Sequence, residues 1–280
     1  PAGAALFFQG GAMESITSRD NRLIKEGRRL LADAKYRRQT GLFLLEGARL
    51  CADAARSGVA IRTVLVTARA REGYGEQLQA IRRGSGAEAA YVEISEEISR
   101  HLGDTASPQG IFCICKTLDN RAALDTINRM GRYIALEDMQ DPANLGTVVR
   151  TAEALGADGL LLSSGCCDLY NPKVLRGSMG GVFRLPFYAV GEMGAAIAAL
   201  QARGMTGWAC VVDPAATPVH KAALGPGSIC IIGNEGNGLR PETAAACRGR
   251  LTIAMAGRAE SLNASMAAGI ILWELMRPQA

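Results

Sequence analysis

A glycine-rich loop near the C-terminal end has the residue types that allow a backbone to approach a ligand closely. The apolar segment 228–232 is typical of a buried strand, and Gly233, Gly236 and Gly238 follow within six residues. Glycine permits sharp turns, and ligands usually bind where parallel strands end. The spacing is neither G-x-G-x-x-G nor G-x-x-x-x-G-K-[ST], so a dinucleotide fold and a P-loop are disfavoured. Taken alone, the loop is equally typical of a simple turn between a strand and a helix.

A second polar segment, residues 141–150, also follows a strand-like apolar stretch. Asn144 could cap a helix that Gly156 ends, and Arg150 would then lie nearly two turns into that helix. A guanidinium at this position could be held against a phosphate or a hydroxyl group. A surface arginine without a specific role is the more common outcome.

A third segment, residues 253–265, leads from a short apolar stretch through a loop into the last predicted helix. Ser261 or Asn263 could simply cap that helix. Alternatively, these side chains and the unpaired backbone N–H groups of the first helical turn could bind a ligand. The segment by itself does not distinguish the two roles.

Two groups of basic residues have the spacing expected of phosphate contacts. Lys173 and Arg176 lie one helical turn apart, so they could contact adjacent phosphates. Residues 19–38 carry eight basic and three acidic residues, a local net charge of +5. They lie on a predicted helix whose apolar contacts are Ile24, Leu30 and Leu31. The whole chain has a net charge of only +4, so composition alone does not indicate a nucleic-acid partner. A solvated helix face is the alternative for both groups.

The elements that must position these residues alternate between strands and helices. An N-terminal α/β domain is predicted, with strands at 42–45, 61–66, 91–94 and 111–115 and helices at 48–56, 75–83 and 96–102. A second alternation has strands at 133–136, 159–162, 208–212, 228–232 and 251–253, and helices at 144–155, 172–179, 193–202 and 262–276. This pattern predicts a mostly parallel sheet covered by helices on both faces. The last helix carries an apolar stripe of Leu262, Met266, Ile270 and Trp273.

Composition excludes several classes of protein. The chain has 280 residues, of which 48% are hydrophobic and 21% charged, so it suits one or two folded domains rather than disorder. The eight cysteines lie partly in strand-like runs, which indicates free thiols in a cytoplasmic protein. Two histidines and the absence of a C-x-x-C pair disfavour a metal site, and no apolar run is long enough to span a membrane. Residues 1–12 are interpreted as an expression-vector remnant before Met13.

Together, and in this order, the three polar segments resemble the motifs of the SpoU/TrmH-type RNA ribose methyltransferases, which belong to the SPOUT superfamily. The motifs are N-x-G-x-x-x-R at 144–150, G-N-E-G-x-G at 233–238, and I-x-M followed by S-L-N-A-S between 253 and 265. Residues 13–115 resemble the small substrate-binding domain of that family, which is similar to a ribosomal-protein fold. The resemblance covers nearly all of the chain after residue 12 and implies a substrate-binding domain at 13–118 and a SPOUT domain at 119–280.

The resemblance implies transfer of a methyl group from S-adenosylmethionine to a ribose 2′-hydroxyl, without a metal ion. It also implies a trefoil knot at roughly residues 230–265, an exception to the rule against threaded chains. The two C-terminal loops would hold the cofactor, through Gly233, Asn234, Glu235, Gly236, Gly238, Leu239, Ile253, Met255, Ser261, Leu262 and Asn263.

The catalytic candidates implied by the resemblance are Arg150, Asn144, Glu235 and Asn263. The pKa of a guanidinium exceeds about 12, so we expect Arg150 to hold the phosphate and the hydroxyl in line rather than to act as a free base. Asn144 and Asn263 would fix that geometry. Glu235 would orient the neighbouring loop or contact RNA.

The expected partner is RNA, with ribosomal RNA favoured over transfer RNA because of the additional N-terminal domain. The candidate RNA contacts are Lys35, Arg37, Arg38, Lys173 and Arg176. A homodimer is implied as well. Two alternatives stay open, namely a non-catalytic RNA-binding module and a nucleotide-dependent oxidoreductase, although the latter lacks its glycine fingerprint.

Overall fold

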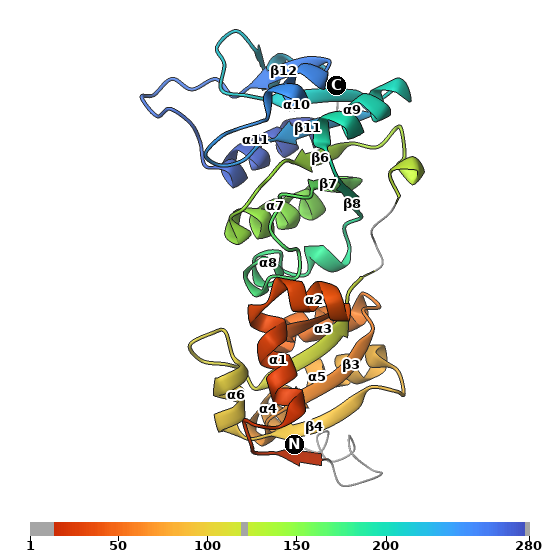
Figure 1. The fold of residues 1–280 in the computed structure, drawn as a ribbon, viewed down its shortest axis with the longest axis vertical. Coiled ribbons are helices and arrows are strands. Elements are labelled where there is room, and N and C mark those ends of the chain that lie inside the picture. The colour runs from red at the N-terminus through yellow and green to blue at the C-terminus, as the bar shows by residue number, and fades with distance from the viewer. Residues whose placement is uncertain (1–13, 119–122, 278–280) are drawn as a thin grey trace. The chain divides into compact units, whose positions relative to one another are not determined.

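The computed structural model describes residues 14–118 and 123–277, which form two compact units (Figure 1). The first unit contains the described residues up to Leu118 together with Tyr170–Arg176, and the second contains the other described residues. Residues 1–12 lie outside the described part, as does the start of the predicted SPOUT domain at 119–122. In the described ranges, no helix combines the length and the apolar character that a bilayer crossing requires.

The first unit has five strands, β1 (Glu14–Ile16), β2 (Leu42–Glu46), β3 (Ile61–Val66), β4 (Ala90–Ile94) and β5 (Ile111–Lys116). They form one sheet in the order β1-β4-β3-β5-β2. β1, β4 and β3 are parallel, whereas β5 runs antiparallel to both β3 and β2. The helices of this unit are α1 (Arg22–Ala32), α2 (Ala34–Thr40), α3 (Ala48–Arg56), α4 (Ala68–Gly73), α5 (Gly75–Ser85), α6 (Glu96–Leu102) and most of α8 (Pro172–Gly177).

The basic segment 19–38 forms two helices rather than the single helix that its charge pattern suggests. Asp33 separates them, because its N–H donates to the carbonyl of Arg29 at 2.9 Å and its carboxylate accepts from the N–H of Tyr36 at 3.0 Å. One residue therefore ends α1 and caps α2. The expected apolar contacts are correct for Ile24 and Leu30, which are buried in the core, whereas Leu31 is only partly buried.

The second unit contains a seven-stranded sheet in which every neighbouring pair of strands is parallel. Its strands are β6 (Tyr133–Leu136), β7 (Gly159–Ser163), β8 (Phe187–Val190), β9 (Thr206–Cys210), β10 (Thr217–Pro218), β11 (Ser228–Ile232) and β12 (Gly249–Thr252), in the order β10-β12-β9-β11-β6-β7-β8. The α-helices are α7 (Pro142–Leu155), α9 (Met193–Ala202), α10 (Pro241–Ala246) and α11 (Ala264–Met276). Short 3₁₀ turns occur at Leu124–Thr126, Gly181–Phe183 and Val219–Lys221.

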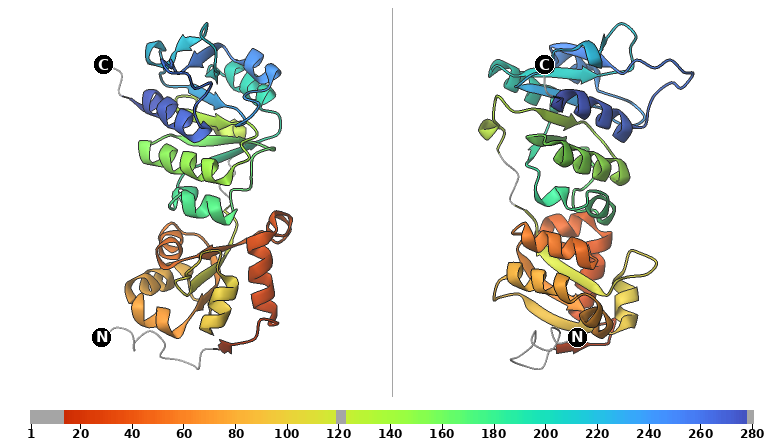
Figure 2. Two further views of the ribbon diagram at one scale, coloured as in Figure 1. Left: turned by 90° about the vertical axis from the view of Figure 1, so that its left-hand side faces the viewer. Right: turned by 180° about the vertical axis from the view of Figure 1, so that it is seen from behind.

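Helices cover both faces of this sheet, as the apolar strands predict. α7 and α11 lie together on one face, and α9 and α10 lie on the other (Figure 2). Successive side chains of a strand point to opposite faces. Ile229 and Ile231 of β11 accordingly join the core beneath α9, whereas Ile232 lines a pocket together with Ile271 of α11.

The apolar stripe predicted on the last helix is present, but it faces outward. Met266 is 61% exposed and Trp273 is 60% exposed, and Leu262 and Ile270 are exposed as well. The buried face of α11 consists instead of Ala268, Ile271, Leu272 and Leu275. α11 is apolar on nearly all sides, so periodicity alone could not show which face packs on the sheet.

Candidate active site

The loop after β11 closes on itself through its own backbone. The N–H of Asn234 donates to the carbonyl of Gly238, and the N–H of Gly238 donates to the carbonyl of Asn234, both at 2.9 Å. A Cβ atom placed on Gly233 would lie 2.1 Å from the carbonyl carbon of Gly238. Gly238 has a φ of 68°, in the left-handed region that favours glycine. Gly233 and Gly238 are therefore required by the fold of this loop.

Glu235 ties this loop to the segment between β6 and α7. One carboxylate oxygen accepts from the N–H of Asp141 at 3.0 Å and from the side-chain amide of Asn144 at 3.2 Å. The other accepts from the N–H of Gln140 at 3.2 Å. Asn234 adds a bond from its amide to the carbonyl of Asp138 at 2.8 Å. Of the two roles considered for Glu235, orientation of the neighbouring loop thus has direct geometric support.

Asn144 links all three motifs, although it is not the helix cap predicted from the sequence. α7 begins two residues earlier, and Asp141 is its N-cap, accepting from the N–H of Ala143 at 2.8 Å. Asn144 is 7% exposed, and its side-chain oxygen accepts from the amide of Asn263 at 3.0 Å. A continuous side-chain path therefore connects Glu235, Asn144 and Asn263.

Asn263 caps the last helix, which is one of the two roles that the sequence left open, and it also contacts Asn144. Its side-chain oxygen accepts from the N–H groups of Ser265 at 2.9 Å and Met266 at 3.3 Å, which makes it the N-cap of α11. Its amide nitrogen meanwhile donates to Asn144. The cap thus sets the start of α11 relative to α7.

Hydrogen bonds determine the ionisation state of Glu235. Burial would raise the pKa of its carboxyl group, but hydrogen bonds from its own N–H, from Asn144 and from the Asp141 and Gln140 N–H groups outweigh it. The pKa of Glu235 is therefore lowered from its ordinary value. At neutral pH the carboxylate is ionised and saturated with donors, which suits an anchor better than a proton acceptor.

Arg150 does not join this side-chain path. It lies six residues after Asn144 on α7, and at about 100° per residue the two side chains leave the helix on different sides. Arg150 is exposed, and within the described ranges no hydrogen bond or ion pair holds its guanidinium. The expectation that Asn144 and Asn263 fix Arg150 directly has no support from these contacts.

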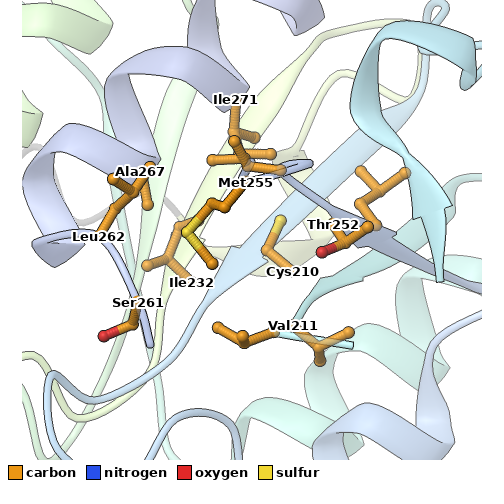
Figure 3. A pocket seen from close by; sticks show the side chains of 12 residues that line it. Cys210, Val211, Ile232, Thr252, Met255, Ser261, Leu262, Ala267 and Ile271 are labelled. Atoms are coloured by element: carbon orange, nitrogen blue, oxygen red, sulfur yellow. The ribbon is translucent and has the colours of Figure 1, made fainter. Parts of the chain in front are cut away.

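A pocket opens beside α11, where β9, β11 and β12 end (Figure 3). Of the candidate cofactor residues, Ile253, Met255, Ser261 and Leu262 line it. Gly233, Asn234, Glu235, Gly236, Gly238 and Asn263 do not, and Leu239 packs partly against the core under α9. The sequence interpretation missed several wall residues, namely Cys210, Val211, Val212, Ile232, Leu251, Thr252, Ala267 and Ile271.

A shift in one strand explains why Val211 and Val212 were missed. They were assigned to a strand at 208–212, but β9 runs from Thr206 to Cys210, so both residues follow the strand. The available signal was their place after an apolar strand, since ligands bind at the carboxyl ends of parallel strands.

The pocket suits an adenosyl group such as that of S-adenosylmethionine. Its walls are mainly apolar, as the faces of a flat purine ring require. In the described ranges, the backbone N–H and carbonyl groups of residues 253–262 belong to no helix or strand and make no main-chain hydrogen bond. They can therefore pair with the polar edge of a base.

A second polar network, also missed from the sequence, supports the glycine loop from its far end. The buried carboxylate of Glu137 accepts from the N–H of Arg240 at 2.8 Å and from the Thr243 hydroxyl at 2.6 Å. The guanidinium of Arg240 donates to Asp138 at 2.7 and 2.9 Å and to Glu192 at 2.8 Å. Glu137 and Asp138 directly follow β6, which is the signal that could have identified them.

The neighbouring cysteine pair has no features of a reactive site. Burial raises the pKa of Cys167 to about 12, and burial also raises the pKa of Cys166. A thiol is nucleophilic only as thiolate, so both side chains are inert near neutral pH.

The candidate RNA contacts differ in accessibility, and the prediction that Arg37 contacts RNA is wrong. Arg37 is only 3% exposed, and its guanidinium donates to the carbonyls of Leu30 at 2.6 Å and Leu31 at 3.0 Å. Its guanidinium is thus buried and donates hydrogen bonds to carbonyl groups at the end of α1 that have no partner within that helix. Arg176 pairs with Asp104 at 2.8 Å. The three remaining candidates, Lys35, Arg38 and Lys173, are exposed.

Comparison with known proteins identifies both parts of the chain. Residues 131–273 match the SpoU rRNA Methylase family, and residues 21–113 match the MRM3-like substrate binding domain. A tRNA/rRNA methyltransferase of Synechocystis is 31% identical over 95% of this chain and 94% of its own length. The 23S rRNA (guanosine(2553)-2′-O)-methyltransferase RlmP of Bacillus subtilis is 28% identical over 94% of this chain and 99% of its own length.

A solved structure has the same fold over the same extent. The AdoMet-bound rRNA methyltransferase of Sinorhizobium meliloti superposes with a TM-score of 0.82 at 28% identity, covering 95% of this chain and 98% of that one. The parallel sheet, the three linked motifs and these similarities define an RNA methyltransferase with a SPOUT fold that uses S-adenosylmethionine as methyl donor. The chain belongs to the SpoU rRNA Methylase family.

Proposed function

We propose that this protein transfers a methyl group from S-adenosylmethionine to a ribose 2′-hydroxyl of ribosomal RNA. The observation that carries the proposal is the hydrogen-bonded path from Glu235 through Asn144 to Asn263, which joins the three family motifs. Similarity to the Bacillus subtilis 23S rRNA 2′-O-methyltransferase over nearly the full length of both chains supports the ribosomal substrate.

The residues of this chain act on the reaction mainly by positioning. The methyl donor, when bound, supplies a methyl carbon on a sulfonium that is already electrophilic. Glu235, Asn144 and Asn263 hold the loops that border the pocket at fixed positions. The exposed guanidinium of Arg150 binds a phosphate of the RNA and keeps the ribose hydroxyl in line for attack.

The RNA is held by the N-terminal domain, residues 13–118, and methyl transfer takes place in residues 119–280. The match of residues 21–113 to a substrate-binding domain supports this division. Of the basic side chains first considered, exposed Lys35, Arg38 and Lys173 are the candidate phosphate contacts, and Arg37 is excluded by its burial. A knotted path near residues 230–265, a cytoplasmic location and the absence of a metal requirement stay predictions.

The active form is a homodimer that covers the exposed stripe of α11. Met266, Ile270 and Trp273 are apolar and exposed on one side of this helix, and a contiguous apolar patch of this kind marks an interaction surface. Trp273→Glu should halve the mass measured by light scattering. Met130→Glu, at an exposed methionine outside the stripe, should leave the mass unchanged. A wild type that is monomeric and active would contradict the dimer.

Methyl transfer from radiolabelled S-adenosylmethionine to purified ribosomal and transfer RNA tests the proposed function. We expect label in the ribosomal fraction, on a ribose, and a loss of about a hundredfold in Arg150→Ala. Arg150→Lys should lose at least about tenfold, because lysine lacks the planar two-point geometry of a guanidinium. Label on a base, label only in transfer RNA, or near-normal turnover by Arg150→Lys would each contradict a stated part of the proposal.

A further inference from the structure

Resting on the proposed function, we propose that Arg29 and Tyr36 form a stacking platform for an unpaired nucleobase of the RNA substrate. The carbon of the Arg29 guanidinium lies 3.9 Å from the centre of the Tyr36 ring. Arg29 is exposed in the last turn of α1, and Tyr36 lies half-buried in the first turn of α2. The guanidinium thus lies over the ring, and Arg29 is exposed, so the group is accessible to a base.

Hydrogen bonds within the protein hold the two halves of the platform together. Asp33 connects its two halves, since it donates to the carbonyl of Arg29 and accepts from the N–H of Tyr36. Buried Arg37 fixes the end of α1 to α2 through the carbonyls of Leu30 and Leu31. A side chain that is already ordered loses less conformational entropy on binding. Arg37 therefore contributes to RNA binding indirectly, as a positioning residue.

The surface around the platform is suited to the phosphates that flank a base. Arg22, Lys25 and Arg29 recur every three or four residues on the exposed side of α1, and Arg28 is exposed next to Arg29. Lys35 and Arg38 are exposed on α2. The acidic residues nearby are already engaged. Asp20 pairs with Lys25 at 2.8 Å, Glu26 pairs with Arg62, and Asp33 caps α2. Within the described ranges, no ion pair holds Arg22, Arg28, Lys35 or Arg38.

The chemistry favours an unpaired base over other partners. Arginine planes and aromatic rings stack on the faces of bases that are splayed out of a helix, whereas a duplex hides those faces. An acidic protein surface would need only the charges, and would gain nothing from a guanidinium stacked on a ring. We therefore assign the platform to a single-stranded or looped segment of the RNA.

Binding of the full-length protein to a short single-stranded oligoribonucleotide, and to an RNA duplex of equal length, tests the platform. Arg29→Lys keeps the charge but loses the planar group. It should weaken single-strand binding by about tenfold, the amount that one stacked base contributes, and change duplex binding by less than about twofold. The slope of affinity against salt concentration should stay constant, because the number of phosphate contacts is unchanged.

Matched variants separate stacking from folding. Tyr36→Phe keeps the ring and should bind as the wild type does, whereas Tyr36→Leu should lose affinity as Arg29→Lys does. Arg56→Lys changes an exposed arginine on α3, outside this surface, and should have no effect. Wild-type affinity of Arg29→Lys for the single strand, or an equal loss for the duplex, would overturn the platform.

Measuring methyl transfer to ribosomal RNA with the same proteins separates this inference from the proposed function. If the wild type methylates ribosomal RNA and Arg29→Lys does so at wild-type KM with wild-type single-strand affinity, the platform is wrong and the function stands. If the wild type shows no transfer while Arg29→Lys loses single-strand affinity, the platform stands and the proposed function is wrong.

Discussion

Two loops border the candidate site, and they differ in how far their own groups are already hydrogen-bonded. Residues 233–240, after β11, are held by the backbone hydrogen bonds between Asn234 and Gly238 and by the carboxylate of Glu235. The backbone N–H and the guanidinium of Arg240 hold the far end of this loop. Residues 253–262, after β12, make no main-chain hydrogen bond within the described ranges until Asn263 caps α11. The first loop therefore provides a fixed frame, and the second keeps its polar groups available for a ligand.

This contrast also explains why glycine has different importance in the two loops. Gly233 has the backbone of Gly238 where its Cβ would be, whereas Gly257 has no atom within 4 Å of that position. The same residue type is thus a steric requirement in one loop and a matter of local flexibility in the other.

The largest effect is expected from Gly233→Ala. The added methyl group would overlap backbone atoms of Gly238, so the loop must open, at a cost of about 2–3 kcal/mol of stability. Displacement of Glu235 and Asn234 should lower methyl transfer by about a hundredfold. Gly257→Ala is the matched control in the other loop and should stay close to wild type in urea unfolding and in kcat/KM. Equal losses in both variants would remove the distinction between the loops.

Glu235→Ala should have the next largest effect. It removes the acceptor for the Gln140 and Asp141 N–H groups and for Asn144, and because the side chain is partly exposed we expect a cost of about 1–2 kcal/mol. Glu260→Ala, in the second loop, should change the unfolding free energy by less than about 0.5 kcal/mol. Denaturant unfolding measures both, and a Glu235→Ala variant as stable as Glu260→Ala would show that the anchor is unimportant.

Asn263→Ala should cost about 1 kcal/mol, the usual contribution of an N-cap. It should also lower kcat, because the bond from Asn144 to the start of α11 is lost. Ser261→Ala, two residues earlier and exposed, should leave stability within about 0.5 kcal/mol of wild type and act only on the KM for S-adenosylmethionine. If the two variants had the same unfolding midpoint, the cap would not contribute as described.

The smallest expected effect is the pH dependence of the Glu235 anchor. Because folding lowers the pKa of Glu235, its contribution is complete above the ordinary glutamate value of about 4.3 and is lost as the pH falls through the lower pKa of the folded state. The stability difference between wild type and Glu235→Gln should therefore shrink from pH 6 toward pH 3.5, measured by urea unfolding. A difference that stays constant over this range would contradict the role of the ionised carboxylate.

Local sequence patterns were sufficient to predict the bounds of those helices and strands that do not depend on contacts with distant segments. The strands 61–66, 133–136 and 228–232 and the helices 48–56, 96–102 and 193–202 have the predicted bounds, because each is an apolar run or an apolar period between turn residues. The three motifs were identified from residue types and their order along the chain. The short elements β1, α4, β8, β10 and α10 were not predicted.

Errors arose where contacts in the folded chain, rather than composition or periodicity, decide the role of a residue. Arg37 belongs to a basic run, yet it is buried because the carbonyls at the end of α1 need a donor. Asn144 is of a residue type that often caps helices, yet Asp141 is the N-cap of α7. The side chain of Asn144 instead forms hydrogen bonds with Glu235 and Asn263. The contacts of Val211 and Val212 depend on where β9 ends.

The sequence by itself determined the family, the alternation of strands and helices, and the three motifs, since all of these are properties of residue order. Only the tertiary structure decided which polar groups meet. The path from Glu235 to Asn263 joins residues from loops that lie far apart in the chain, and the outward face of α11 depends on which side of an all-apolar helix packs on the sheet. The physical reason is that hydrogen bonds and burial are satisfied between neighbours in space, and a linear pattern records neighbours only along the chain.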